Sequence, residues 1–171
     1  MKIEIIEPIG YCSGVSNAIA KAISVRKEFP NKSIYILGSL VHNSHVIDSL
    51  ESIGIKSITD SITSLQEKIN SLEDDCIVVF TAHGHDEKVD EIALKKRMKI
   101  IDCICPKVKA NMTQIKRNIE EGNEVIFVGI KNHPETLARL SISSKVPTIV
   151  LTILYKNLEP QIVISTVSPS F

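Results

Sequence analysis

The sequence predicts an α/β fold in which parallel sheets carry flanking helices. Short β-branched runs alternate with segments of helical periodicity along most of the 171 residues. Residues 76–80 are continuously apolar, which is typical of a strand buried on both faces of a parallel sheet. Strands that alternate with helices need crossover connections, and such connections produce parallel sheets. We expect two α/β units, at residues 1–105 and 106–171.

The first expected strand and helix meet at a cysteine between two glycines. Residues 3–9 form the apolar strand. The apolar residues that follow recur on one helix face: Val15, Ala18, Ile19, Ala22 and Ile23. Cys12 lies between Gly10 and Gly14, where glycine permits a sharp turn and close approach of a ligand. The first amides of a helix lack partners within it. This junction predicts either a thiolate or anion site, or a tight turn around an ordinary buried cysteine.

The same alternation continues up to residue 105. The expected strands are residues 33–37, 55–58, 76–80 and 99–102. The expected helices are residues 45–53, 61–72 and 86–97. Gly54 stands where a left-handed cap ends the helix at 45–53. Asp86 is suited to cap the helix at 86–97.

The second unit begins with a helix that Pro106 fits in its first turn. The apolar stripe of this helix is Val108, Met112, Ile115 and Ile119, and Gly122 ends it. The elements expected after it are a strand at 124–128, a loop at 129–135, a helix at 137–144, and strands at 148–154 and 161–166.

Composition excludes two classes of partner. Hydrophobic residues make up 43% and charged residues 23%, which is the usual balance of a folded domain. Twenty basic residues balance twenty acidic ones, so the chain lacks the basic excess that nucleic acid or a membrane surface favours. No secretory signal or membrane-length apolar run is present in the sequence. We therefore expect a cytoplasmic, reducing location, where the four cysteines act as ligands, catalysts or core residues.

Reactive side chains follow five of the expected strands, at the edge where open parallel sheets bind ligands. They are Cys12, His42 with Asn43, His83, Cys105, and His133 with Glu135. Packing does not require such residues at loop starts, so their recurrence predicts a common site. Thiolates bind soft metals and iron–sulfur clusters, and histidines hold polyanions such as diphosphate. A glutamate beside them can pass a proton.

The remaining cysteines and histidines have simpler interpretations. Cys76 lies inside an apolar strand and is expected in the core. Strand alternation turns Cys103 away from Cys105, which favours a structural role for Cys103. His45 and His85 are expected at the surface or as helix caps. His42, taken alone, fits a structural and a functional interpretation equally well.

Five ordered motifs carry a resemblance to a known family. They are Tyr-Cys-Ser-Gly-Val at 11–15, Leu-Val-His-Asn at 40–43, Ala-His-Gly at 82–84, Asp-Cys-Ile-Cys-Pro-Lys-Val at 102–108 and Asn-His-Pro-Glu at 132–135. They resemble the signatures of the LytB-type 4-hydroxy-3-methylbut-2-enyl diphosphate reductases, iron–sulfur enzymes of the non-mevalonate isoprenoid pathway. The family usually has threonine where this chain has Ile104.

The resemblance implies an oxidoreductase of three α/β units around a [4Fe–4S] cluster. Such an enzyme removes a hydroxyl from an allylic diphosphate to give isopentenyl and dimethylallyl diphosphate, using an electron donor such as ferredoxin or flavodoxin. Cys12 and Cys105 match two of the family's three cluster-ligating cysteines. The histidines that match its diphosphate ligands are His42, His83 and His133. Glu135 matches the carboxylate that helps to deliver a proton to the substrate.

The family's third cysteine and third unit have no counterpart after Cys105 in this sequence. We expect the second unit to be incomplete and the cluster to lack a ligand, unless Cys103 turns inward or a partner chain supplies the missing unit. The alternative is a non-catalytic, truncated binding module, with zinc held by Cys12, Cys105 and two histidines. A third possibility is an inactive fragment that self-associates through an exposed apolar face.

Overall fold

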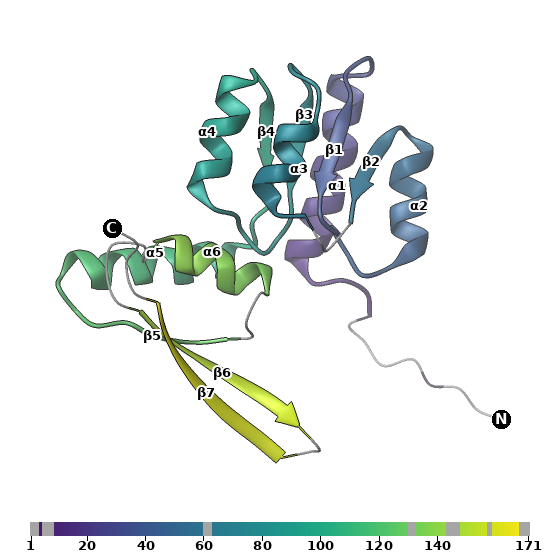
Figure 1. The fold of residues 1–171 in the computed structure, drawn as a ribbon. Helices are drawn as coiled ribbons and strands as arrows, with labels where there is room; N and C mark the ends of the chain where they lie inside the picture. The colour runs from purple at the N-terminus through teal and green to yellow at the C-terminus, as the bar shows by residue number, and fades with distance from the viewer. Residues whose placement is uncertain are drawn as a thin grey trace.

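The computed structural model describes residue 4 and residues 9–59, 63–129, 133–142, 148–156 and 159–167. Helices and strands alternate along the chain (Figure 1). The helices are α1 (Ser13–Glu28), α2 (Ser44–Ser52), α3 (Leu65–Ser71), α4 (Glu87–Lys95), α5 (Pro106–Glu120) and α6 (Pro134–Ile142). The strands are β1 (Ile34–Leu37), β2 (Ile55–Ile58), β3 (Ile77–Phe80), β4 (Lys99–Asp102), β5 (Ile126–Val128), β6 (Thr148–Lys156) and β7 (Glu159–Val167). The expected α/β fold is confirmed.

The first four strands form one parallel sheet in the order β2-β1-β3-β4. Ile34 of β1 pairs with Ile55 on one side and with Ile77 on the other. Every residue of β3 is buried, as its unbroken apolar pattern predicted. The expected first strand at residues 3–9 lies outside the described residues, except for Glu4 and Ile9.

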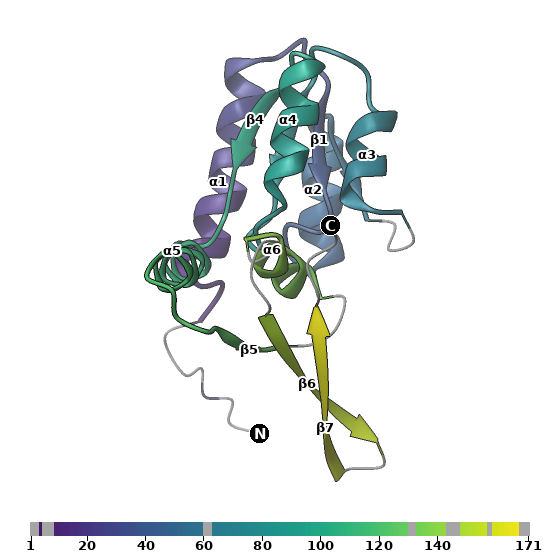
Figure 2. The ribbon, with the colours of Figure 1, turned by 60° about the vertical axis from the view of Figure 1, so that its left-hand side comes forward.

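Helices cover both faces of this sheet (Figure 2). On one face, α1 and α2 contribute Ala18, Ala22 and Leu50 to a core with Val79 of β3. On the other face, α3 and α4 pack a second core against Val78 and Phe80. Alternate residues of β3 therefore serve opposite cores, and each fully buried apolar side chain contributes about 1.5–3 kcal/mol.

The local sequence explains where most of these helices begin. Asp86 caps α4 by accepting a hydrogen bond from the backbone N–H of Lys88, as expected. Helix α3 starts at Leu65, later than predicted, because Ser64 and Glu67 form a reciprocal capping box there. The predicted C-terminal boundary of the loop at 129–135 is wrong. Helix α6 begins at Pro134, which suits a first turn, and Glu135 therefore lies on this helix.

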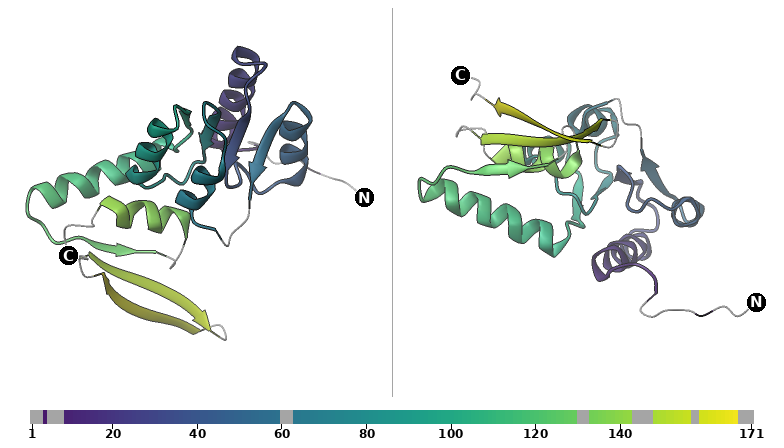
Figure 3. Two further views of the ribbon diagram at one scale, coloured as in Figure 1. Left: turned by 45° about the horizontal axis from the view of Figure 1, so that its top comes forward. Right: turned by 90° about the horizontal axis from the view of Figure 1, so that it is seen from below.

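The last three strands form a second sheet in the order β5-β6-β7. β5 pairs with β6 in parallel, while β7 is antiparallel to β6 because only two residues separate these strands, too few for a crossover. Helices α5 and α6 lie between this sheet and the first one (Figures 1 and 3). Ile126 and Val128 of β5 are exposed apolar residues.

The order helix–strand–helix–strand occurs twice, as α1-β1-α2-β2 and again as α5-β5-α6-β6. In each copy the two strands pair in parallel. The N-cap of the opening helix is Cys12 in the first copy and Cys105 in the second. The two cysteines therefore occupy equivalent positions in a structural repeat. The boundary at residue 105 remains a prediction. Within the described ranges, no helix combines the length and apolar character needed to cross a membrane.

Candidate functional site

Cys12 and Cys105 share the space beside Gly14. A β-carbon placed on Gly14 would lie 3.5 Å from Cys105 Sγ and 3.9 Å from Cys12 Sγ. Cys12 is exposed and Cys105 is half-buried, and neither side chain forms a capping hydrogen bond with its helix. Two thiols from distant parts of the sequence therefore converge next to a backbone position that has no side chain to fill the space.

Both cysteines are the N-cap residues of their helices, where the first backbone amides have no partner within the helix. Thiolates are the usual ligands of iron–sulfur clusters, so the chemistry of these two side chains fits such a group. The described part of the chain contains no group of three or more His, Cys, Asp or Glu residues arranged to hold a metal ion.

A second cluster forms where the loop after β3 contacts the start of α6. His83 Nδ1 lies 3.3 Å from Glu135 Oε1, and the rings of His83 and His133 meet edge to face with centroids 5.5 Å apart. The backbone N–H of Cys105 donates to the carbonyl of Ala82 at 3.1 Å. This bond places the histidine loop directly beside the residue that carries one of the two thiols.

Hydrogen bonds distinguish the two histidines of this cluster. The backbone N–H of Glu135 donates to His133 Nδ1 at 3.2 Å, so that nitrogen is an acceptor and the ring proton of neutral His133 lies on Nε2. His83 Nδ1 faces a carboxylate and is therefore a donor. His133 can offer a neutral N–H to a ligand, whereas His83 can carry a positive charge that Glu135 balances.

The loop after β1 is tied to the segment that carries Cys12. Asn43 caps α2 by accepting from the backbone N–H of Val46, and its amide donates to the Tyr11 hydroxyl at 2.8 Å. His42 is exposed on this loop. Among the described residues, no hydrogen bond or ring contact joins His42 to the cluster of His83, His133 and Glu135.

The structural interpretation of two cysteines is confirmed. Cys76 is buried immediately before β3, and the Cys103 thiol is directed to the carbonyl of Ala18 at 4.0 Å within the α1 core. Burial raises the pKa of both thiols, chiefly because a thiolate would lose its hydration there.

The expectation for His45 is confirmed, but the one for His85 is wrong. His45 is exposed on α2. The His85 side chain is only 8% exposed, and its ring stacks on Phe80 with centroids 3.7 Å apart. Its Nε2 lies 2.9 Å from Asp90 Oδ1. The Phe80 ring provides an apolar face on which this histidine packs, and His85 in turn helps to bury Phe80.

Thiol alkylation should separate the cysteines into two classes. At pH 8, iodoacetamide is expected to label Cys12 and Cys105 quickly, since both are accessible at helix N-termini. Cys76 and Cys103 should react slowly, because their raised pKa values keep them protonated and their burial blocks the reagent. Mass spectrometry of timed samples measures the rates, and denatured protein, in which all four react alike, is the control. Equal rates in the folded protein would contradict the assignment.

Sequence reasoning missed Arg139, which lies on α6 with only 8% of its side chain exposed. It donates to the backbone oxygen of Glu135 at 2.8 Å and to Asn111 Oδ1 at 2.7 Å. The available signal was the spacing of four residues between Glu135 and Arg139, which brings the two side chains together on one helix face.

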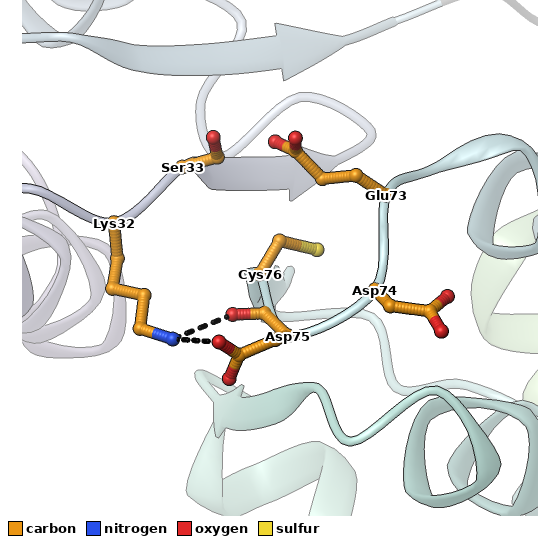
Figure 4. A pocket seen from close by; sticks show the side chains of 6 residues that line it. All are labelled: Lys32, Ser33, Glu73, Asp74, Asp75 and Cys76. Atoms are coloured by element: carbon orange, nitrogen blue, oxygen red, sulfur yellow. Dashed lines mark hydrogen bonds and ion pairs between the residues drawn. The ribbon is translucent and has the colours of Figure 1, made fainter.

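A cavity of about 170 Å³ lies elsewhere, before the amino ends of β1 and β3 (Figure 4). Its lining residues are Lys32, Ser33, Glu73, Asp74, Asp75 and Cys76, and Lys32 bridges to Asp75 across it. Parallel sheets bind ligands at their carboxyl ends, where the thiols and histidines lie. We therefore regard the carboxyl ends of the strands, and not this cavity, as the candidate functional site.

Comparison with known proteins identifies the chain's relatives. Residues 3–168 match the model of a family described as LytB protein. The chain is 38% identical to the 4-hydroxy-3-methylbut-2-enyl diphosphate reductase of Malacoplasma penetrans, over 85% of this chain and 50% of that one. It is also 38% identical to the 4-hydroxy-3-methylbut-2-enyl diphosphate reductase of Bacillus subtilis, over 86% of this chain and 46% of that one. The solved structure of the Plasmodium falciparum reductase superposes with a TM-score of 0.72 at 31% identity, over 84% of this chain and 42% of that chain. The chain spans about half the length of these relatives.

Proposed function

Because the chain belongs to the LytB family, we propose that it provides part of a site for reductive removal of the hydroxyl group from 4-hydroxy-3-methylbut-2-enyl diphosphate. The products of that reaction are isopentenyl and dimethylallyl diphosphate, and the chain would act as an oxidoreductase of isoprenoid biosynthesis. The observation that carries this proposal is the convergence of the Cys12 and Cys105 thiols beside Gly14.

Cys12 and Cys105 would hold a [4Fe–4S] cluster through their thiolates. When bound, such a cluster supplies electrons and a Lewis-acidic iron to the substrate's hydroxyl group. Gly14 keeps the space between the two sulfurs clear of side-chain atoms. Cys103 is directed into the α1 core, so the third thiolate would come from a partner chain.

His42, His83 and His133 would bind the diphosphate. His133 offers its Nε2–H to a phosphate oxygen, because the amide of Glu135 occupies its other ring nitrogen. His83 can bind as an imidazolium beside the Glu135 carboxylate. Glu135 would hold and release a proton at Oε1, which faces the His83 ring at 3.3 Å. His42 would approach the ligand from the loop after β1.

We also propose a cytoplasmic location and a small electron donor such as ferredoxin or flavodoxin. Free thiols at helix N-termini are suited to a reducing compartment. Reductive removal of an allylic hydroxyl consumes two electrons and two protons and releases water. An electron carrier would therefore have to reach the carboxyl ends of the strands of the first sheet, where both thiols lie.

Anaerobic reconstitution tests the proposal. Purified protein is treated with ferrous iron and sulfide, desalted, and measured for visible absorbance, iron and acid-labile sulfide. We expect a broad charge-transfer absorption with iron and sulfide in equal amounts. Protein purified in air and analysed for zinc tests the alternative of a zinc-binding module, which predicts one zinc and no iron per chain. Absence of iron and labile sulfide after reconstitution would contradict the reductase proposal.

A further inference from the structure

Arg139 is a buried charge beside the proposed diphosphate site. Only 8% of its side chain is exposed. Its Nη1 donates to the Glu135 backbone oxygen at 2.8 Å and to Glu135 Oε2 at 3.3 Å, while its Nε donates to Asn111 Oδ1 at 2.7 Å. The guanidinium carbon lies 5.2 Å from the centre of the Phe127 ring. Every one of these contacts fixes the orientation of the guanidinium group.

Packing alone does not account for a charged residue at this position. Removing an ion from water costs several kcal/mol, and an apolar side chain of similar volume would fill the same space without that cost. Arginine differs from such a side chain, and from lysine, in offering several N–H donors in a rigid fork. Here the fork connects α6 to Asn111 on α5 and to the Glu135 carboxylate at the same time.

The Glu135 carboxylate lies between the Arg139 guanidinium and the His83 ring. Its Oε2 accepts from Arg139, and its Oε1 lies against His83 Nδ1. Both oxygens therefore have fixed partners, and the carboxylate keeps one orientation. A carboxylate among histidines that bind a diphosphate would otherwise repel that anion, since like charges brought together cost several kcal/mol.

We propose that Arg139 is a positioning residue that neutralises Glu135 and holds it against His83, so that an anionic diphosphate can bind beside this carboxylate. The identity of the ligand in this inference rests on the proposed function. The contacts among Arg139, Glu135 and His83 do not depend on it. Asn111 completes the arrangement by accepting from Nε of Arg139 and so orienting the fork.

Binding of inorganic diphosphate, measured by titration calorimetry, tests the proposal. Arg139→Met removes the charge and keeps an apolar stem, and it is expected to weaken binding by at least about tenfold. Arg139→Lys keeps the charge without the fork and should give an intermediate affinity. Arg117→Met is the matched control, because Arg117 pairs with Glu121 at the same spacing of four residues on the exposed side of α5. It should leave binding unchanged.

A second substitution distinguishes this role from a purely structural one. Glu135→Gln in the Arg139→Met background removes the carboxylate that is left without its counter-charge, and it should restore diphosphate affinity to within about threefold of the Glu135→Gln single variant. If Arg139 only supports the fold, Glu135→Gln cannot repair its loss. Unchanged binding in Arg139→Met, or no recovery in the double variant, would overturn the proposal.

A spectroscopic measurement separates this inference from the proposed function. NMR of protein labelled with ¹⁵N-histidine should show a proton bound to His83 Nδ1 in slow exchange with water, because Glu135 accepts it. This signal should disappear in Arg139→Met and persist in Arg117→Met, with thermal unfolding as the check on folding. If the unsubstituted protein binds no diphosphate, the proposed function fails. Persistence of the His83 signal in Arg139→Met would refute the role of Arg139 in either case.

Discussion

Cys12→Ser and Cys105→Ser are each expected to abolish retention of iron after anaerobic reconstitution. The two thiols converge beside Gly14, and the described residues offer no further cysteine at that point. A serine hydroxyl stays protonated near neutral pH and is a hard oxygen ligand, so it binds ferrous and ferric sulfide clusters poorly. Each variant would leave a single thiolate, too few to hold a cluster through desalting. Iron per chain and visible absorbance measure the loss.

The folded state should survive both substitutions, because neither side chain caps its helix. Serine is in fact a better N-cap than cysteine. Cys76→Ala is the control, and Cys103→Ala tests whether Cys103 can replace a missing ligand. Both should retain iron like the unsubstituted protein, since these thiols lie in the core. Full iron content in Cys12→Ser, or its loss in Cys103→Ala, would show that the ligand assignment is wrong.

Phe80→Ala is expected to reduce the free energy of unfolding by about 3–5 kcal/mol, the usual cost of removing a buried aromatic ring. Phe80 is 1% exposed at the end of β3, where it packs against the core under α3 and α4. The substitution would also remove the surface on which the His85 ring stacks. Because domains of this size are stable by only about 5–15 kcal/mol, the substitution would remove a large fraction of the stability of the fold.

Urea unfolding followed by circular dichroism measures this effect. Phe29→Ala is the matched control, because the Phe29 ring is only half-buried. Lys99 Nζ lies over this ring, 3.9 Å from its centre. The loss in this variant should be about 1 kcal/mol, from the cation–π contact and partial burial. Equal losses in the two variants would contradict the central position assigned to Phe80.

Local sequence was sufficient for most of the secondary structure and for the identity of the candidate residues. The unbroken apolar run of β3 identified a strand with both faces buried, and Asp86 marked the start of α4 correctly. The predicted helix boundaries were less accurate where a capping interaction was not recognised, as with the capping box that starts α3 at Leu65. The family followed from five short motifs, because each is a contiguous run that can be read without knowledge of the fold. The roles of the individual site residues remain predictions.

Only the tertiary structure decided which of these side chains meet. It brought the Cys12 and Cys105 thiols together at Gly14, set His83 against Glu135, and buried Arg139 against Glu135. It also turned His85 onto Phe80, against the prediction of a surface residue. These contacts join residues that are far apart in the chain or depend on how helices pack on a sheet. The periodicity and spacing of residues reflect only the local backbone conformation, so they cannot specify such contacts.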